Sequence, residues 1–429
     1  MSLASLPRLL RNEPALTQAL GDPDGFVAVP ESARALALAA LAQLSDRRPL
    51  VIACPTGTDA GQLYDDLVQY MPTGDVVLFP AWETLPFERV SPSVETMGHR
   101  MEVLWRLRSH DRCPAIVVAG VRALLQQLGP EATTVDPIHV AKGAVLDPDA
   151  LMARLIHFGY RREELVEHRG EVAQRGAIID IFPSTADAPI RIDLWGDEVD
   201  RLTEFAVNDQ RSTLDLADTY VFPARELIPT DDVKTRAAAL VATEPWGREQ
   251  WERLAEGTLF DGMESWLPWL VSEHQLLTDV LPSTAKVALV EPRRMRDRAN
   301  DLLAEEDDLA RALAGTWARD ASKTFPRLHA DTDRLLASGQ SMWTISNAPE
   351  HPDSPMVNAS GWGPVVGDGE GLAGRLRELL ADGYRVVVAA DGEGSAQRMS
   401  SLLLDRGLSF APVGPDADLT KPGGYIATA

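Results

Sequence analysis

The segment Leu50–Gln62, LVIACPTGTDAGQ, has the layout on which the fold depends: a short apolar run, a turn with proline and glycine, and the start of a helix. This is the layout of a phosphate-binding loop (Walker A), whose pattern is G-x-x-x-x-G-K-[ST]. Here Cys54 and Asp59 stand in place of the two glycines, and Ala60 stands in place of the lysine. Gly61 replaces the hydroxyl residue that would bind magnesium.

These replacements remove the groups that handle phosphate. Gly57 keeps the turn, but a carboxylate at Asp59 would repel the β- and γ-phosphates of a nucleotide. Ala60 cannot supply the positive charge of the missing lysine. The segment is therefore either a degenerate nucleotide site or an ordinary strand, turn and helix that never bound a nucleotide, and a motif this short leaves both interpretations open.

Size and charge limit the class of protein. At 429 residues the chain is too long for one hydrophobic core, so we expect two to four domains. Its 41 Lys and Arg against 64 Asp and Glu give a formal net charge of −23. Basic side chains that displace counterions supply much of the affinity for duplex DNA, so this acidity argues against a generic nucleic-acid binder. A local basic patch would still be compatible with it.

The sequence also limits the compartment. No apolar run approaches the roughly 20 residues needed to span a membrane, and residues 1–8 lack the layout of a signal peptide. We therefore expect a cytoplasmic protein. Its two cysteines, Cys54 and Cys113, cannot form a metal cluster alone, and a disulfide is not expected in a reducing cytosol.

Residues 1–130 alternate short apolar runs with helical stretches, which is typical of a parallel sheet covered on both faces. The expected strands are Phe26–Val29, Leu50–Cys54, Val76–Pro80 and Ala115–Ala119. Helices are expected around 33–44, 59–70, 95–108 and 121–128. Between these elements, the proline-rich stretch Trp82–Pro92 is expected to be a loop with aromatic anchors.

Residues 131–225 change to a β-rich pattern. In Ile190–Trp195 the apolar residues alternate, so Arg191 and Asp193 share the face opposite the core. Gln174–Pro183 is expected to be a second, more buried strand. The region therefore looks like a small β-rich domain inserted into the α/β one.

Later residues return to α/β patterns. Lys286–Glu291 has the shape of a Walker B strand, but Pro292 follows Glu291 and cannot act as a general base. An ordinary core strand ending in a turn is the alternative for this stretch.

Three stretches of the β-rich region carry a specific resemblance: Gly159–Arg162, Arg175–Pro183 and Arg191–Leu202. They resemble domain 2 of the bacterial excision-repair protein UvrB, and more closely the same region of the transcription-repair coupling factors. Phe79–Phe87 and Phe260–Pro268 are also similar to that family. The resemblance covers essentially all 429 residues, but only the N-terminal part of a full-length coupling factor.

The resemblance implies an α/β fold: a degenerate UvrB- and helicase-like parallel-sheet domain, an inserted β-rich domain and a small C-terminal α/β domain. The expected boundaries are 1–130 for the first part of the parallel-sheet domain, 131–225 for the UvrA-binding domain, 226–335 for the second part of the parallel-sheet domain, 336–355 for a linker and 356–429 for the small domain.

The departures from UvrB imply lost activities. UvrB keeps an intact phosphate-binding loop and a tyrosine-rich β-hairpin that clamps DNA. This chain has Asp59 and Ala60 in the loop, Glu291 followed by proline in place of acidic motor residues, and the shorter Trp82–Pro92 in place of the hairpin. We therefore expect no catalytic residue, no cofactor and no metal.

In the UvrB family the second domain docks on UvrA, the damage-recognition ATPase, through charged residues. Carried over by motif, the candidates are Arg161 or Arg162, Arg175, Arg191 and Asp193. Exposed arginines are common anchors of interfaces. The alternative is that these arginines only form a solvated face of the domain.

Phe182 is an apolar candidate for the same surface. A continuous strand would place Phe182 opposite Arg175, unless the strand bends at Pro183. We expect the arginines of this surface, Arg175 and Arg191 among them, to contribute little to the stability of the fold.

The sequence thus predicts a non-catalytic adaptor that recruits UvrA to stalled RNA polymerase in nucleotide excision repair by mimicking UvrB. The resemblance implies that the C-terminal domain of the full-length protein covers the UvrA-binding face, and that RNA polymerase and DNA are contacted only through regions beyond residue 429. Two alternatives are a divergent nucleotide hydrolase that uses Asp59 or Glu291, and a DNA-binding helicase-like module.

Overall fold

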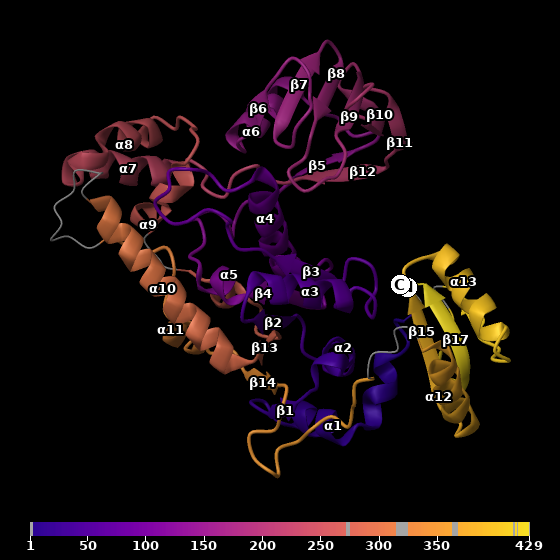
Figure 1. Cartoon of the computed structure of the whole chain (residues 1–429). Coiled ribbons are helices and arrows are strands. Elements are labelled where there is room, and N and C mark those ends of the chain that lie inside the picture. The colour runs from indigo at the N-terminus through magenta and orange to yellow at the C-terminus, as the bar shows by residue number, and fades with distance from the viewer. Residues whose placement is uncertain are drawn as a thin grey trace.

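The computed structural model describes residues 3–271, 275–314, 325–362, 368–414, 417 and 419–428. Its centre is a parallel sheet of six strands in the order β1-β14-β13-β2-β4-β3 (Figure 1). The strands are β1 (Phe26–Ala28), β2 (Leu50–Cys54), β3 (Val76–Phe79), β4 (Ile116–Gly120), β13 (Lys286–Val290) and β14 (Met342–Ser346).

Helices cover both faces of this sheet because its central strands are apolar on both sides. Within β2, Leu50 and Ile52 face one core, and Val51 and Ala53 face the other. The first core is closed by α1 (Pro14–Gly21), α2 (Arg34–Leu44) and α3 (Gly57–Leu67). The second is closed by α4 (Val94–Arg108), α5 (Val121–Leu125), α10 (Pro292–Ala314) and α11 (Thr332–Leu336).

The β-rich domain packs against α4, where the ring centroids of Trp105 and Tyr220 lie 5.2 Å apart (Figure 1). Its larger sheet has the order β11-β10-β9-β8-β7-β6. These strands are β6 (Arg161–Arg162), β7 (Glu171–Arg175), β8 (Ile178–Ile181), β9 (Ile190–Trp195), β10 (Glu198–Phe205) and β11 (Ser212–Asp215). The pair β5 (Ile138–Ala141) and β12 (Asp218–Val221), together with α6 (Pro148–His157), encloses the core on one face of that sheet.

The expectation of one strand over Gln174–Pro183 is wrong. The stretch forms the hairpin of β7 and β8, in which Arg175 pairs with Ile178. Gly176 adopts a positive φ of 62°, a conformation that costs glycine little and allows this tight turn.

The region after the β-rich domain packs around tryptophans. It contains α7 (Asp231–Thr243), α8 (Arg248–Ala255) and α9 (Leu267–Leu270). Trp251 and Trp266 are fully buried, with ring centroids 4.6 Å apart in an edge-to-face arrangement. Short 3₁₀ helices occur at Pro7–Asn12, Glu31–Ala33, Pro245–Gly247, Met263–Trp266 and Leu277–Val280.

The stretch 336–355 differs from the expected linker. It contains β14, which lies inside the main sheet between β1 and β13 and pairs with both in parallel. Trp343 and Ile345 on this strand are buried in the core shared with α1 and α2. Burial of these alternate residues, rather than the surrounding prolines, decides the local structure.

The small C-terminal unit contains α12 (Gly369–Ala381), α13 (Glu393–Leu404) and a parallel sheet in the order β15-β17-β16. Its strands are β15 (Arg385–Ala390), β16 (Ala411–Val413) and β17 (Gly423–Thr428). None of the helices in the described ranges combines the length and apolarity that a membrane span requires.

Candidate functional site

A buried carboxylate held by two arginines lies on the face of the β6–β11 sheet that is turned away from the domain core. The Asp180 side chain is 1% exposed. Arg191 contacts both of its oxygens, with Nε 2.7 Å from Oδ1 and Nη2 2.9 Å from Oδ2. Arg175 Nη2 lies 2.6 Å from Oδ2. Hydrogen bonding to Asp180 raises the pKa of Arg191 above its usual value, so this guanidinium keeps its charge.

Strand register produces this cluster. Asp180 in β8 lies directly opposite Arg191 in β9, and residues opposite each other direct their side chains to the same face. Arg175 lies before the turn at Gly176 and pairs with Ile178, which is two residues before Asp180 on the same strand. Arg175 therefore lies on the same face as Asp180. Arg191 also donates a hydrogen bond of 3.0 Å to the Gln210 carbonyl, and its guanidinium lies 4.6 Å from the centroid of the Phe205 ring. Arg191 is therefore a well-fixed side chain rather than a mobile one.

The register also separates Arg161 from Arg162. Arg161 pairs with Glu171 in β7, which shares the face of Arg175, and its Nη2 lies 3.4 Å from Glu171 Oε1. Arg162 pairs with Val172, which points into the core of the domain. Both arginines are exposed on this edge strand. By register, Arg161 therefore joins the Arg175 face and Arg162 does not.

The placement of Phe182 opposite Arg175 is wrong, because the hairpin reverses the chain between them. Phe182 follows Asp180 by two residues and packs with Ala173 and Phe205 on the side of the arginines. Its residue exposure is only 7%, so it forms part of the floor beneath the charged side chains. Asp193 lies on the same face, partly exposed and directly opposite Arg201 in β10.

The loop that resembles a phosphate-binding site is filled by its own side chains. Thr56 caps α3: its Oγ1 accepts a hydrogen bond of 3.0 Å from the Asp59 amide and donates one of 2.7 Å to Asp59 Oδ2. Asp59 Oδ2 also lies 3.3 Å from Arg294 Nη2 of α10. The helix N-terminus, where backbone N–H groups would meet a phosphate, therefore faces a carboxylate. Ala60 is buried in the core and Gly57 begins the helix.

The strand that resembles Walker B ends at the same edge of the sheet. Glu291 follows β13, which pairs directly with β2. Its Oε1 accepts a hydrogen bond of 2.7 Å from the Asn347 amide and lies 3.3 Å from Arg34 Nη2. Arg34 also donates a hydrogen bond of 2.6 Å to Asn347 Oδ1. Glu291 is therefore held in a structural ion pair.

The cavity left at this edge is small. It measures about 80 Å³ and is lined by residues that include Arg34, Cys54, Asp59 and Arg294. Pockets that hold small-molecule ligands typically measure about 300–1,000 Å³. The structure thus brings the predicted nucleotide-site residues to one edge of the main sheet, around a cavity smaller than a typical ligand pocket.

The segment Trp82–Pro92 is packed into the protein rather than extended as a hairpin. The Trp82 indole Nε1 donates a hydrogen bond of 2.8 Å to Glu226 Oε2, and Glu226 is also held by Arg100 at 2.7 Å. All three side chains are buried. Phe87 packs against Phe325 at a ring-centroid distance of 5.1 Å.

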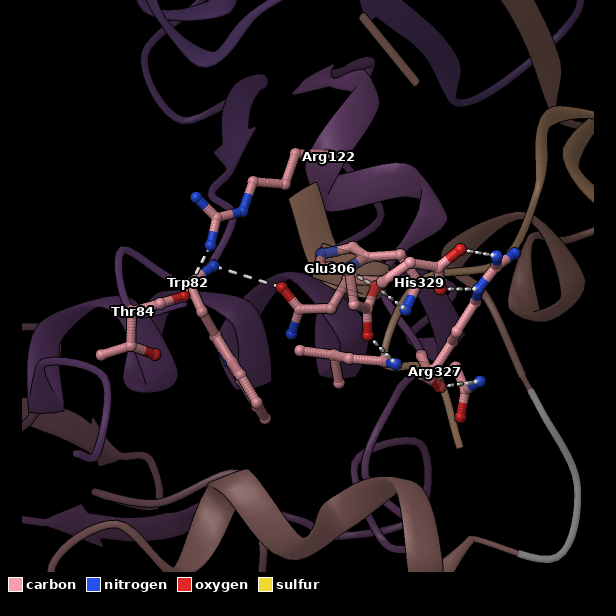
Figure 2. A network of polar contacts seen from close by, with 10 residues as sticks. Trp82, Thr84, Arg122, Glu306, Arg327 and His329 are labelled. Carbon is pink, nitrogen blue, oxygen red and sulfur yellow. Dashed lines mark hydrogen bonds and ion pairs between the residues drawn. The ribbon is translucent and has the colours of Figure 1, made fainter. Parts of the chain in front are cut away.

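Figure 2 shows a network of polar contacts beside this segment. Arg122 of α5 donates a hydrogen bond of 2.5 Å to the Thr84 carbonyl. Glu306 of α10 lies at 3.0 Å from Nδ1 of the buried His329. Arg327 forms an ion pair with Asp307, the residue after Glu306. These contacts join α5 to the Trp82–Pro92 segment, and α10 to residues 327 and 329.

Sequence reasoning missed three residues that organise these sites: Asp180, Arg34 and Arg294. Asp180 stands among apolar residues of its strand, and a charged residue at such a position is a signal that a partner is needed. Arg34 and Arg294 are helix residues whose contacts depend on the tertiary fold, and no local pattern marks them.

Comparisons with known proteins identify the β-rich domain and the relatives of the chain. The model of the UvrB interaction domain family matches residues 138–227, which contain all six candidate docking residues. The chain is 37% identical over 360 residues to the transcription-repair-coupling factor of Mycobacterium tuberculosis (strain CDC 1551 / Oshkosh), covering 79% of this chain and 28% of that protein. It is 30% identical over 317 residues to the transcription-repair-coupling factor of Escherichia coli K12, covering 71% of this chain and 25% of that protein. It is 29% identical over 355 residues to the factor of Bacillus subtilis 168, covering 77% of this chain and 30% of that protein.

The parallel sheet with its inserted domain thus defines the class: an α/β protein that carries a UvrB interaction domain. The chain is a homologue of the transcription-repair-coupling factors. It spans between 25% and 30% of the length of the three relatives described.

Proposed function

We propose that this chain is a non-catalytic adaptor that recruits UvrA in transcription-coupled nucleotide excision repair. The observation that carries the proposal is the cluster of Arg175 and Arg191 on Asp180. It lies on the outward face of the domain that matches the UvrB interaction family.

The cluster suits a docking surface because its charges are prearranged. Asp180 fixes Arg191 through two contacts, so little side-chain freedom is lost when a partner binds. Arg175 is 47% exposed and Arg161 is 68% exposed, which leaves both accessible to carboxylates of a partner. UvrA would meet this face as it meets the corresponding face of UvrB.

Loss of ATP handling is part of the proposal. The Asp59–Arg294 and Glu291–Arg34 pairs occupy the edge where a nucleotide would sit, and the remaining cavity is small. Loss of DNA handling follows from the net charge of −23 and from the burial of Trp82 and Phe87, which anchor the Trp82–Pro92 segment to the protein.

The family resemblance extends the proposal to the full-length protein. There the C-terminal domain would cover the docking face until UvrA is needed. RNA polymerase and DNA would be contacted by regions beyond residue 429, and translocation along DNA would belong to those regions.

The test is binding of the purified chain to immobilised UvrA, measured by biolayer interferometry. We expect Arg175→Ala to weaken binding by more than about tenfold, because truncating one partner of a hydrogen-bonded charge pair that docking buries typically costs about 2–5 kcal/mol. Arg296→Ala is the matched control, since Arg296 is an exposed arginine on α10, outside the matched domain. Absence of binding by the unsubstituted chain would contradict the proposal, as would equal binding by both variants.

A further inference from the structure

Two apolar side chains stand exposed at one end of the β6–β11 sheet. Trp195 is the last residue of β9 and is 82% exposed. Val145 precedes α6 and is 75% exposed. Glu198 lies between them in the ladder, because it pairs with Trp195 on one side and bridges Val145 on the other. We call Trp195 and Val145 the apolar tip.

The apolar tip lies on the same face as the arginine cluster. Directly opposite residues of adjacent strands point to the same face of a sheet. The side chains of Trp195, Glu198 and Val145 therefore lie on one face. Trp195 also follows Arg191 by four residues on an alternating strand, which places it on the Arg191 side. The tip therefore continues the proposed docking face toward the end of the sheet.

The backbone beneath the tip is well fixed. Gly196, with a φ of 68°, and Asp197 form the two-residue turn between β9 and β10. The Leu146 amide donates a hydrogen bond of 2.7 Å to the Asp197 carbonyl, and the Val199 amide donates one of 2.9 Å to the Ala144 carbonyl. These bonds hold the indole on a rigid support, and the fold itself buries little of it.

We propose that the apolar tip is the hydrophobic anchor of the UvrA-docking face, a role that rests on the proposed function. UvrA would present an apolar pocket to Trp195, beside acidic groups that meet Arg175 and Arg191. Tryptophan and arginine are the side chains most enriched among residues that dominate binding energy. A second copy of this chain is a poorer occupant, because two copies of net charge −23 repel each other.

The test compares UvrA binding by Trp195→Ala, Trp195→Phe and Leu214→Ala. We expect at least a tenfold loss of affinity for Trp195→Ala and less than a threefold loss for Trp195→Phe, which keeps an aromatic ring. Leu214 is the matched control: it is 56% exposed and pairs with Glu204, on the opposite face of the same sheet. The melting temperature should stay unchanged in all three variants, since each side chain replaced is mostly exposed.

The outcomes separate this inference from the proposed function. If Trp195→Ala binds UvrA like the parent while Arg175→Ala is weakened, the anchor is wrong and the docking face stands. If the parent chain does not bind UvrA, both are wrong. If sedimentation velocity shows a dimer that Trp195→Ala dissociates, a second copy is the occupant and the inference is overturned.

Discussion

Replacing Arg191 with alanine should destabilise the β-rich domain as well as weaken docking. Arg191 makes three hydrogen bonds, two to Asp180 and one to the Gln210 carbonyl, and its side chain is only 15% exposed. Without Arg191, the carboxylate of Asp180 stays buried with Arg175 as its remaining arginine partner. The expectation that both arginines matter little for stability therefore needs revision for Arg191.

The expected size follows from this geometry. Breaking a buried ion pair by removing one partner costs about 3–5 kcal/mol. Arg175 stays 2.6 Å from Asp180, and Arg191 is not fully buried, so we expect a loss of about 2–3 kcal/mol for Arg191→Ala. Arg175→Ala removes one contact of a half-exposed side chain and should cost under about 1 kcal/mol.

Native-state hydrogen exchange followed by mass spectrometry can measure this loss in one domain of a larger chain. In peptides that cover β8 and β9, a loss of about 2–3 kcal/mol corresponds to amide exchange about 30- to 150-fold faster. Arg296→Ala serves as the control on another element. Unchanged exchange in Arg191→Ala, or an equal effect of Arg175→Ala, would refute the reasoning from Asp180.

Three further predictions concern other parts of the chain. Isothermal titration should detect no ATP binding at millimolar nucleotide, because Asp59 occupies the helix N-terminus; heat of binding that disappears in Gly57→Ala would contradict this. Fluorescence anisotropy at physiological salt should show no submicromolar affinity for single- or double-stranded DNA, and tight binding would remove the adaptor-only interpretation. Burial lowers the pKa of His329, so the unfolded chain binds more protons than the folded chain once the pH falls below about 6.5, and stability should decrease from there downward. Melting temperatures between pH 7.5 and 5 should fall less in His329→Gln, and identical profiles would rule out this residue as a source of the decrease.

The main sheet could be predicted where its strands are apolar throughout, as in β2 and β4. Both faces of these strands are buried, so each strand appears in the sequence as a short unbroken run of apolar residues. A helix that covers the sheet needs apolar residues on one side only. Strand β14 was missed because its partly polar sequence, next to prolines, resembles a linker. Its place between β1 and β13 depends on pairing with segments far away in the chain, which local patterns do not encode.

The face proposed for docking could be predicted only in part. Alternation along β9 correctly placed Arg191 and Asp193 on the face opposite the core. The error on Phe182 came from ignoring Gly176, since a glycine inside a strand pattern signals a bend or turn. Asp180 was not predicted as a site residue. It meets Arg191 only because β8 pairs with β9 in a particular register, and this pairing depends on the tertiary fold.

The position of β13 in the main sheet has a consequence for synthesis on the ribosome. Strand β2 can pair with β4 early, but its other edge must wait until the whole β-rich domain and the tryptophan-rich helices have been made. At about 5–20 residues per second, the wait from Cys54 to Lys286 lasts roughly 10–50 s. During this time β2, whose five residues are all buried in the finished sheet, presents an unpaired edge, which is a template for pairing with other nascent chains. The β-rich domain has all its strands by Val221, before β13 is made, so it can fold while the main sheet is still open to aggregation.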